Sequence, residues 1–322
     1  MVQHRPSHPR SLRPGAGRWP GAAVKVTAVV LDWNGHQDTL ACLRSLREVS
    51  GLDIVVVDNG SRPRLAEACG DELVGVTLLE NDQNLGYAGG NNVGLKRALA
   101  DGAEAVWVLN NDTVVDPEAL DLLLACLERH PRAAAVAPAV LSADDPSRLW
   151  VAWGEVNWLQ SLVRLVGQGR EYGPRWQGER EVPWLPGCSV LFRRAALEAV
   201  GLFDENYFAY HEDVDWAARA RELGWSMHYS GLATVVHRGS ASSGGYSGFK
   251  RYLSARNSVL YARRHGSFQQ RVLLAAAIVL TLPFQYLRRL ATGEQGGVLL
   301  KLRGWLDGLA GRPIPFEQLH LR

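Results

Sequence analysis

Cysteine is scarce in this sequence of 322 residues. The four cysteines lie far apart, at Cys42, Cys69, Cys126 and Cys188. They form no C-x-x-C pair, which argues against a zinc site and against a disulfide framework. We therefore expect reduced thiols in a cytosolic setting.

An excess of charge of one sign is also absent, because the formal net charge is only +2. No strong attraction to nucleic acid follows from that balance, and no nucleic-acid partner is expected. Hydrophobic residues make up 47% of the chain and charged residues 21%, as in globular proteins that build a core. The length suits one large domain, or a domain with an appendage.

The common phosphate-binding signatures are missing as well. The first apolar segment, Val24–Leu31, is followed by Asp-Trp-Asn-Gly, and G-x-G-x-x-G is absent at that point. The chain also has no Walker A sequence. These absences argue against a dinucleotide-dependent dehydrogenase and against a P-loop enzyme.

The amino-terminal residues 1–23 are rich in Arg, Pro, Gly and His and show no periodicity. This composition predicts a disordered basic tail. The segment lacks the apolar stretch and the small-residue cleavage site of a signal peptide. We therefore expect the chemistry to face the cytoplasm.

Short apolar runs alternate with helical patterns from residue 24 onward. Strands are predicted at Val24–Leu31, Ile54–Val57, Val74–Leu79, Ala105–Leu109 and Ala133–Val140. Helices are predicted at about 36–49, between the glycine-rich stretch 81–92 and Ala100, and from Pro117. This alternation predicts an α/β fold with a mostly parallel, doubly wound sheet.

Polar residues follow each of these strands. In open α/β sheets ligands bind at the carboxyl ends of strands, so these residues are expected to share one edge. Asn110-Asn111-Asp112 follows the fourth strand and offers a carboxylate to a divalent cation, although such residues also favour a plain turn. Glycines at Gly86, Gly89 and Gly90 let backbone approach a ligand, or else make a mobile loop.

The second half of the chain changes character. Residues 144–180 hold several tryptophans and predict either a pocket wall or small antiparallel strands on the sheet edge. A strand is predicted at 184–194 and a short helix at 195–200. Glu212, Asp213 and Asp215 then follow an aromatic run at the start of a predicted helix. Acids in a first helical turn are favoured by the helix dipole, or one of these carboxylates has a raised pKa and acts as a general base. His237 ends a further strand as a satisfied polar residue or a metal ligand.

A series of short motifs runs in order from Val24 to Gly266: VVLDWNG, VVVDNGS, NLGYAGGNN, LNNDT, GCSVLFRR, FAYHEDVDWAAR and HRGSAS. Together they resemble the family 2 glycosyltransferases of the GT-A fold, in the subgroup often described as rhamnosyltransferases. The resemblance implies a metal-dependent, inverting transferase that moves a sugar from a nucleotide diphosphate to a glycan or a lipid-linked glycan of the cell envelope.

The resemblance also assigns residues to the donor site. It places Trp33 and Asn34 in the first donor-binding loop, and it makes Asp58 the acid that bonds the nucleotide base. Asn84 and Gly86 match the N-x-G loop beside the nucleotide.

Asn110-Asn111-Asp112 stands in the place of the family's D-x-D motif, with Asp112 as the carboxylate for Mg²⁺ or Mn²⁺. Because Asn110 replaces the first acid, metal affinity should fall and His237, a supplementary metal or diphosphate ligand, should matter more. Asp213 matches the general base, with Glu212 as the competing assignment.

The donor remains open at this stage. We expect dTDP-rhamnose first and a UDP-hexose or UDP-N-acetylhexosamine second, because thymine and uracil present the same hydrogen-bonding edge. A nucleotidyltransferase is a further enzyme class, although the Asp-Trp-Asn-Gly loop lacks the basic, glycine-rich character of a triphosphate loop. A lectin-like or scaffold protein is the non-enzyme reading, and a homo-oligomer is compatible with the pattern.

The carboxy-terminal part predicts helices. The segment from Lys250 to Arg303 contains ten Lys or Arg residues and a single acid, Glu294. An apolar stretch runs from Val272 to Phe284. This stretch has about sixteen residues up to Leu287, fewer than the roughly twenty that span a bilayer. We therefore expect helices that lie on an anionic inner-membrane surface, or else a helical subdomain that packs on the core. The predicted division is 1–23 tail, 24–248 catalytic domain (nucleotide half 24–140, acceptor half 141–248) and 249–322 helices.

Overall fold

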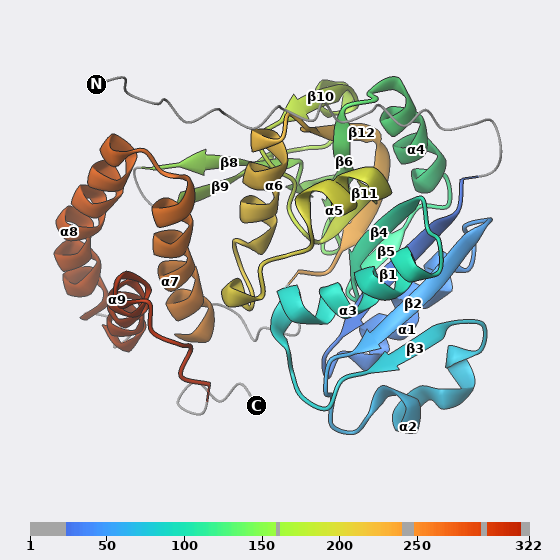
Figure 1. The fold of residues 1–322 in the computed structure, drawn as a ribbon, viewed down its shortest axis with the longest axis horizontal. Coiled ribbons are helices and arrows are strands. Elements are labelled where there is room, and N and C mark those ends of the chain that lie inside the picture. The colour runs from blue at the N-terminus through green and yellow to red at the C-terminus, as the bar shows by residue number, and fades with distance from the viewer. Residues whose placement is uncertain (1–23, 159–161, 240–247, 291–294, 317–322) are drawn as a thin grey trace, which may run out of the picture.

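A twisted, mostly parallel β-sheet forms the centre of the computed structural model (Figure 1). The structure describes residues 24–158, 162–239, 248–290 and 295–316, so the predicted basic tail 1–23 lies outside the described residues. The predicted parallel strands appear as β1 (Val26–Asp32), β2 (Leu52–Asp58), β3 (Thr77–Glu80), β4 (Ala105–Asn110) and β6 (Ala133–Ser142). Two further strands of the sheet are β11 (Ser189–Arg193) and β12 (Ser226–His237).

The strand order is β10-β12-β6-β11-β4-β1-β2-β3. The β1, β2, β3 and β4 strands are mutually parallel where they pair, as predicted. Strand β11 runs antiparallel between β4 and β6, so the sheet is mixed at that point. The short strand β5 (Thr113–Val115) pairs with the end of β12, which brings His237 opposite Thr113.

Side chains at alternate positions of the central strands enter two different cores. Val29, Val106 and Val108 lie in the core beneath α3 (Gly86–Ala100), α5 (Arg194–Val200) and α6 (Glu212–Glu222). Their neighbours Trp107 and Leu109 lie in the core beneath α1 (His36–Leu46) and α4 (Ala119–Arg129). Apolar side chains on both faces are the mark of a sheet covered by helices on both sides.

The tryptophan-rich segment forms small antiparallel strands, as one of the two readings predicted. These are β7 (Leu149–Val151), β8 (Trp153–Asn157), β9 (Leu162–Val166) and β10 (Glu179–Val182). Strand β7 pairs with β6, β10 pairs with β12, and β8 and β9 form a hairpin. Short helical segments at α2 (Leu65–Cys69), Gly70–Leu73, Pro174–Trp176 and Glu205–Tyr207 complete the connections.

The glycine-rich stretch 81–92 differs from its predicted form as a loop, because α3 already begins at Gly86. Gly89 and Gly90 lie inside the first turns of this helix. A Cβ atom on Gly90 would lie 2.5 Å from Cδ1 of Leu31, and one on Gly89 would lie 2.9 Å from Cβ of Leu85. These glycines therefore allow close packing of α3, and this tertiary packing outweighs the low helix propensity of glycine.

Three helices follow the sheet domain: α7 (Gly248–His265), α8 (Phe268–Leu290) and α9 (Gln295–Ala310). They stand beside α6 at the end of the molecule farthest from β2 and β3, with α8 outermost (Figure 1). Helix α8 has 23 residues, so it is longer than the apolar stretch predicted. In the part of the chain described, it is the helix long and apolar enough, by length and composition alone, to cross a membrane.

Candidate active site

The end of β1 carries the most heavily hydrogen-bonded carboxylate of the sheet edge, Asp32, which is completely buried. Its register places it beside Asp58 at the end of β2, and Leu31 lies beside Asn110 at the end of β4. The donors to Asp32 are the Gly35 N–H (3.1 Å), His36 Nδ1 (2.9 Å), Thr39 Oγ1 (2.6 Å), Ser61 Oγ (3.1 Å) and Asn111 Nδ2 (3.1 Å). One carboxylate thus joins the loops that follow β1, β2 and β4.

The loop after β1 holds Trp33, which is half-buried, and Asn34, which is exposed. Asn34 adopts a left-handed φ of 57°. Its N–H donates to Ser61 Oγ (2.9 Å), and its Oδ1 accepts from the Arg62 N–H (2.8 Å). The sequence placed Trp33 and Asn34 in a donor-binding loop, and the structure fixes that loop against the one after β2.

Asp58 is also fully buried. Its two oxygens accept from the N–H groups of Ser61 (2.8 Å) and Leu65 (2.9 Å). These bonds hold the turn after β2 in place. The contact between Asp58 and a nucleotide base stays a prediction.

Asn84 joins the start of α3 to the loop after β2, and Gly86 lies against the loop before α6. Asn84 Oδ1 accepts from the Gly86 N–H (2.8 Å) and from Asn59 Nδ2 (3.0 Å). Gly86 has a φ of +75°, and a Cβ atom there would lie 2.4 Å from the carbonyl oxygen of Phe208. Glycine is therefore required at position 86 by conformation and by space.

The three residues after β4 divide into two roles. Asn111 Nδ2 points back into the protein, to Asp32, to the Gly35 carbonyl (3.2 Å) and to Thr39 Oγ1 (3.1 Å). Asp112 Oδ1 instead lies 3.0 Å from Nε2 of His237, and Asn110 Nδ2 lies 3.3 Å from the same nitrogen. The structure therefore brings together Asn110, Asp112 and His237, as the sequence predicted for a metal centre.

The Asp112–His237 pair fits a divalent cation. Two ligands at neighbouring corners of an octahedral ion with bonds of about 2.1 Å lie about 3 Å apart, and the two donor atoms here are separated by 3.0 Å. Both side chains are nearly buried, and Trp150 packs on the His237 ring with 4.3 Å between ring centroids. A carboxylate oxygen with an imidazole nitrogen suits Mn²⁺ well and Mg²⁺ through the oxygen.

The two acids that open α6 differ in protonation. Asp213 accepts from the N–H groups of Gly187 (3.0 Å) and Val214 (2.8 Å). Burial raises the pKa of Asp213 to about 6, against the lowering effect of these bonds. Burial, followed by the charge of Asp213, raises the pKa of Glu212 well above its usual range, and one Glu212 oxygen is buried without a partner. Burial therefore favours the protonated form of Glu212 more strongly than that of Asp213, whose carboxylate form is stabilised by two backbone N–H groups.

Cys188 lies between the Asp112–His237 pair and these acids. The pKa of its thiol is raised mainly by burial, and next by the negative charges of Asp112 and Asp213 in that order. The Cys188 carbonyl accepts from the Asn110 N–H (2.9 Å), and the preceding residue, Gly187, donates to Asp213. One short segment before β11 thus connects the two groups of side chains.

The loop before α6 is backed by the carboxy-terminal helix α7. Phe208, Tyr210 and His211 all adopt positive φ angles, of 61°, 69° and 74°, which side-chain-bearing residues rarely adopt. The Asn257 side-chain amide donates to the carbonyls of Tyr207 (2.9 Å), Ala209 (2.9 Å) and Tyr210 (2.7 Å). Helix α7 therefore stabilises the strained backbone that presents Glu212 and Asp213.

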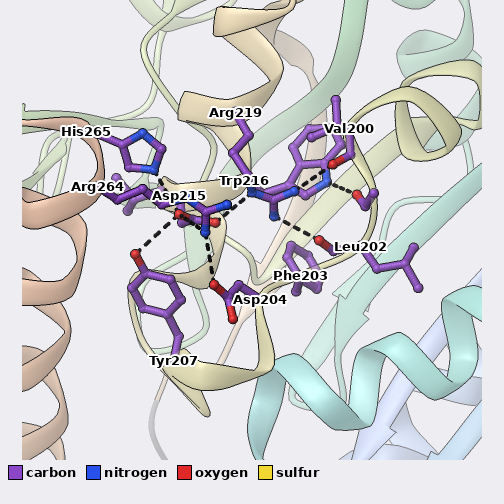
Figure 2. Close-up of polar contacts among 12 residues, drawn as sticks. Val200, Leu202, Phe203, Asp204, Tyr207, Asp215, Trp216, Arg219, Arg264 and His265 are labelled. Carbon is purple, nitrogen blue, oxygen red and sulfur yellow. Dashed lines mark hydrogen bonds and ion pairs between the residues drawn. The ribbon is translucent and has the colours of Figure 1, made fainter. Parts of the chain in front are cut away.

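Asp215, the third acid of the run, has a different function (Figure 2). It is fully buried and contacts Arg219 Nε (2.8 Å), His265 Nε2 (2.8 Å), Arg264 (3.3 Å) and the Tyr207 hydroxyl (3.3 Å). Burial alone would raise its pKa, but the bonds from His265 and Arg219 lower it overall. Asp215 thus anchors α6 to the end of α7.

Sequence reasoning missed Asp32 and Asn257 as residues of the site. Asp32 carried a usable signal, because it ends a strand and is followed by Gly35 and Thr39 at positions where a turn and the first helical turn can donate to it. Asn257 carried none, since it lies far along the chain in a segment predicted only as a basic helix.

Comparisons with known proteins agree with these features. The sequence profile described as "Glycosyl transferase family 2" matches residues 28–201. The chain is 31% identical over 244 residues, 69% of its length and 78% of the relative, to N-acetylglucosaminyl-diphospho-decaprenol L-rhamnosyltransferase of Mycobacterium tuberculosis H37Rv. It is 31% identical over 192 residues, 57% of its length and 60% of the relative, to galactofuranosyltransferase GlfT1 of Mycolicibacterium smegmatis.

Solved structures share the fold. The mannosyltransferase PcManGT of Pyrobaculum calidifontis, in complex with GDP-Man and Mn²⁺, superposes with a TM-score of 0.51 at 19% identity, over 90% of this chain and 89% of that one. TarS of S. aureus superposes with a TM-score of 0.54 at 15% identity, over 88% and 81%. These likenesses confirm the predicted GT-A fold.

Replacing Asn257 by Ala tests the support that α7 gives to the acid loop. We expect turnover to fall by about tenfold, with donor affinity changed by less than about twofold, because a displaced base slows the reaction more than it weakens binding. Steady-state kinetics and calorimetric titration with the donor measure the two effects. The matched control is Ser258→Ala, whose hydroxyl bonds only the Ala255 carbonyl of its own helix. Equal turnover in the two variants contradicts the assignment.

Proposed function

The chain belongs to glycosyl transferase family 2 and is a glycosyltransferase, and on that premise we propose that it transfers a sugar from a nucleotide diphosphate to a lipid-linked glycan with inversion at the anomeric carbon. The observation that carries this proposal is that the Asp112–His237 pair and the Asp213 carboxyl are connected by the short segment Gly187–Cys188, which bonds to Asp213 and to Asn110.

The donor would lie along the loops that Asp32 joins. Trp33 and Asn34 would contact the donor from the first loop, and Asp58 would bond the nucleotide base. Asn84 and Gly86 would border the donor at the start of α3. Asn110 and Asp112 would face the diphosphate, and Asn111 would support the donor loops through its bonds to Asp32. A Mg²⁺ or Mn²⁺ ion held by Asp112 and His237 would neutralise the charge of the leaving diphosphate. The divalent ion also accords with the Mn²⁺ bound to PcManGT.

Asp213 would act as the general base. Its carboxylate takes the proton from an acceptor hydroxyl, and that oxygen forms the new bond at the anomeric carbon on the face opposite the diphosphate. The backbone bonds from Gly187 and Val214 orient Asp213 for this step. Because burial favours the protonated form of Glu212, this residue would not place a second negative charge next to the base.

The donor we favour is dTDP-rhamnose, and the acceptor a lipid-linked saccharide. The 31% identity to an L-rhamnosyltransferase supports this choice. The similar identity to a galactofuranosyltransferase keeps a UDP-hexose, or a UDP-N-acetylhexosamine, as the second candidate.

A lipid-linked acceptor requires the site to lie near a membrane, and we propose that α8 provides the contact at the cytoplasmic face. Of its 23 residues, Leu274 is the one buried, whereas Val279, Leu280 and Phe284 are each more than two-thirds exposed. Arg271 near its start and Arg288 near its end would face anionic headgroups. On this proposal, residues 249–316 join the catalytic domain to the lipid surface.

Replacing Asp213 by Asn should lower the transfer rate by about 100-fold or more, the usual contribution of a general base, while donor binding survives. The wild-type rate should rise as the pH increases through about 6, because Asp213 must lose its proton to act. Rates measured from pH 4.5 to about pH 8 with both proteins check this expectation. Glu212→Gln serves as the comparison. A greater loss of rate in that variant than in Asp213→Asn reverses the assignment of the base.

The donor and the metal are tested by thermal stabilisation with a panel of dTDP-, UDP- and GDP-sugars, with and without Mg²⁺ or Mn²⁺. A bound donor should raise the melting temperature by mass action, and dTDP-rhamnose should do so most. Asp112→Ala and His237→Ala should abolish the metal-dependent part of the rise in melting temperature. Asp53→Ala, which alters an exposed acid at the opposite end of β2, should leave it intact. A metal-dependent shift retained in Asp112→Ala excludes the proposed centre.

Membrane attachment is tested by sedimentation with phosphatidylglycerol-containing vesicles and with phosphatidylcholine vesicles. Binding should favour the anionic vesicles and weaken with added salt. The double change Leu280→Glu with Phe284→Glu should lower binding about tenfold or more, since two apolar side chains no longer enter the lipid. Val74→Glu, at an equally exposed valine of the sheet domain, is the matched control. Equal binding of the two variants rules out α8 as the contact.

A further inference from the structure

A second group of metal-ligating side chains lies at the opposite edge of the sheet from the active site. Cys126 lies in the last turn of α4, His130 is the residue that follows this helix, and His228 lies near the start of β12. Each offers one ligand atom, and these atoms lie within 4.8 Å of one another. Along β6, His228 pairs with Val136 and His237 with Ser142, so the group is about 20 Å from the active-site histidine.

His228 is held in the form that binds metals. The side chain is 6% exposed, and its Nδ1 atom is buried without a hydrogen-bond partner. Its Nε2 lies 3.0 Å from Ser226 Oγ, and that hydroxyl donates its own proton to the Arg132 carbonyl (3.2 Å). The Ser226 oxygen must therefore accept from Nε2–H, which leaves a lone pair on the unpartnered Nδ1.

His130 is oriented in a similar way. Its Nε2 lies 3.0 Å from a carboxylate oxygen of Glu179, and its ring stacks on that of His228 with 4.0 Å between centroids. The hydrogen bond from Arg129, and next the one from His130, lowers the pKa of Glu179 although burial acts in the opposite direction. The Glu179 carboxylate therefore accepts the hydrogen bond from His130. A carboxylate that fixes one nitrogen of a histidine while the other binds metal is a common arrangement around zinc.

We propose that Cys126, His130 and His228 bind a structural Zn²⁺ ion, with Glu179 orienting His130. Zinc is preferred because one thiolate and two imidazoles form a set of sulfur and nitrogen ligands, whereas the active site offers a carboxylate and an imidazole. Metal bonds of about 2.0–2.3 Å would require the ligand atoms, now within 4.8 Å of one another, to move closer and the stacked rings of His130 and His228 to turn toward a common point. The ion would fasten the end of α4 to the first residues of β12.

The binding step exchanges a proton for the metal. Zinc bonds to the sulfur as the S–H proton leaves to solvent, with no change in oxidation state.

The spacing of cysteines in the sequence gave no indication of this site. The expectation against zinc rested on the absence of a C-x-x-C pair, whereas these three residues come from two elements that only the fold brings together. Cys126 and His130 are four residues apart, and the His130 N–H donates to the Cys126 carbonyl (3.1 Å) where the helix ends. The third ligand follows about a hundred residues later.

The test uses the full chain with Asp112→Ala, so that the active-site pair does not contribute. After removal of metal with EDTA, the protein is titrated with Zn²⁺, and bound metal is measured after dialysis. We expect one tightly held Zn²⁺ per chain and a higher melting temperature. Co²⁺ in place of Zn²⁺ should give a near-ultraviolet thiolate-to-metal absorption band.

Cys126→Ser should abolish both the bound zinc and the cobalt–thiolate band. Cys69→Ser, which changes another buried cysteine outside the cluster, should preserve both. If Cys126→Ser fails to fold, His130→Ala at the half-buried end of α4 provides the second test, with loss of tight zinc binding expected. Retention of one Zn²⁺ in these variants, or absence of tight zinc binding in the Asp112→Ala parent, overturns the proposal.

Discussion

The buried carboxylate of Asp32 is the interaction on which the donor side of the site depends. It receives donors from the loops after β1, β2 and β4, so a single side chain determines how three strand ends are joined. Hydrogen bonds to a charged group contribute about 1.5–3 kcal/mol each, and a buried charge is tolerated only when it is well bonded. The loops are therefore ordered before any ligand arrives.

The other side of the site is built differently. Asp213 follows three residues with positive φ angles, and this backbone is maintained by contacts from α7 and by the buried bonds of Asp215. One half of the site is thus stabilised locally, within the parallel strands. The other half depends on a helix that enters from the carboxy-terminal part of the chain.

Much of this arrangement follows from sequence. The parallel strands and their polar ends were predictable, because strand periodicity and turn residues are local properties. The pairing of Asp112 with His237 was implied only by the resemblance to the transferase family. The antiparallel insertion of β11 and the early start of α3 were not predictable, since they depend on which segments pack together. Asn257 and the Cys126 cluster illustrate the same limit, because their partners are separated by about 50 and about 100 residues. The assignments of Asp58 to the base and of Asp213 to catalysis remain predictions.

The dependence of the acid loop on α7 has a practical consequence for where the chain can be shortened. The region matched by the family profile ends at residue 201, before both α6 and α7. Cutting the chain just before α7, to remove the apolar α8, would also remove the amide of Asn257 and the imidazole of His265. The carbonyls of Tyr207, Ala209 and Tyr210 would lose their donor, and Asp215 would lose two of its cationic neighbours. The smallest unit that retains a complete site is therefore larger than the sequence profile suggests.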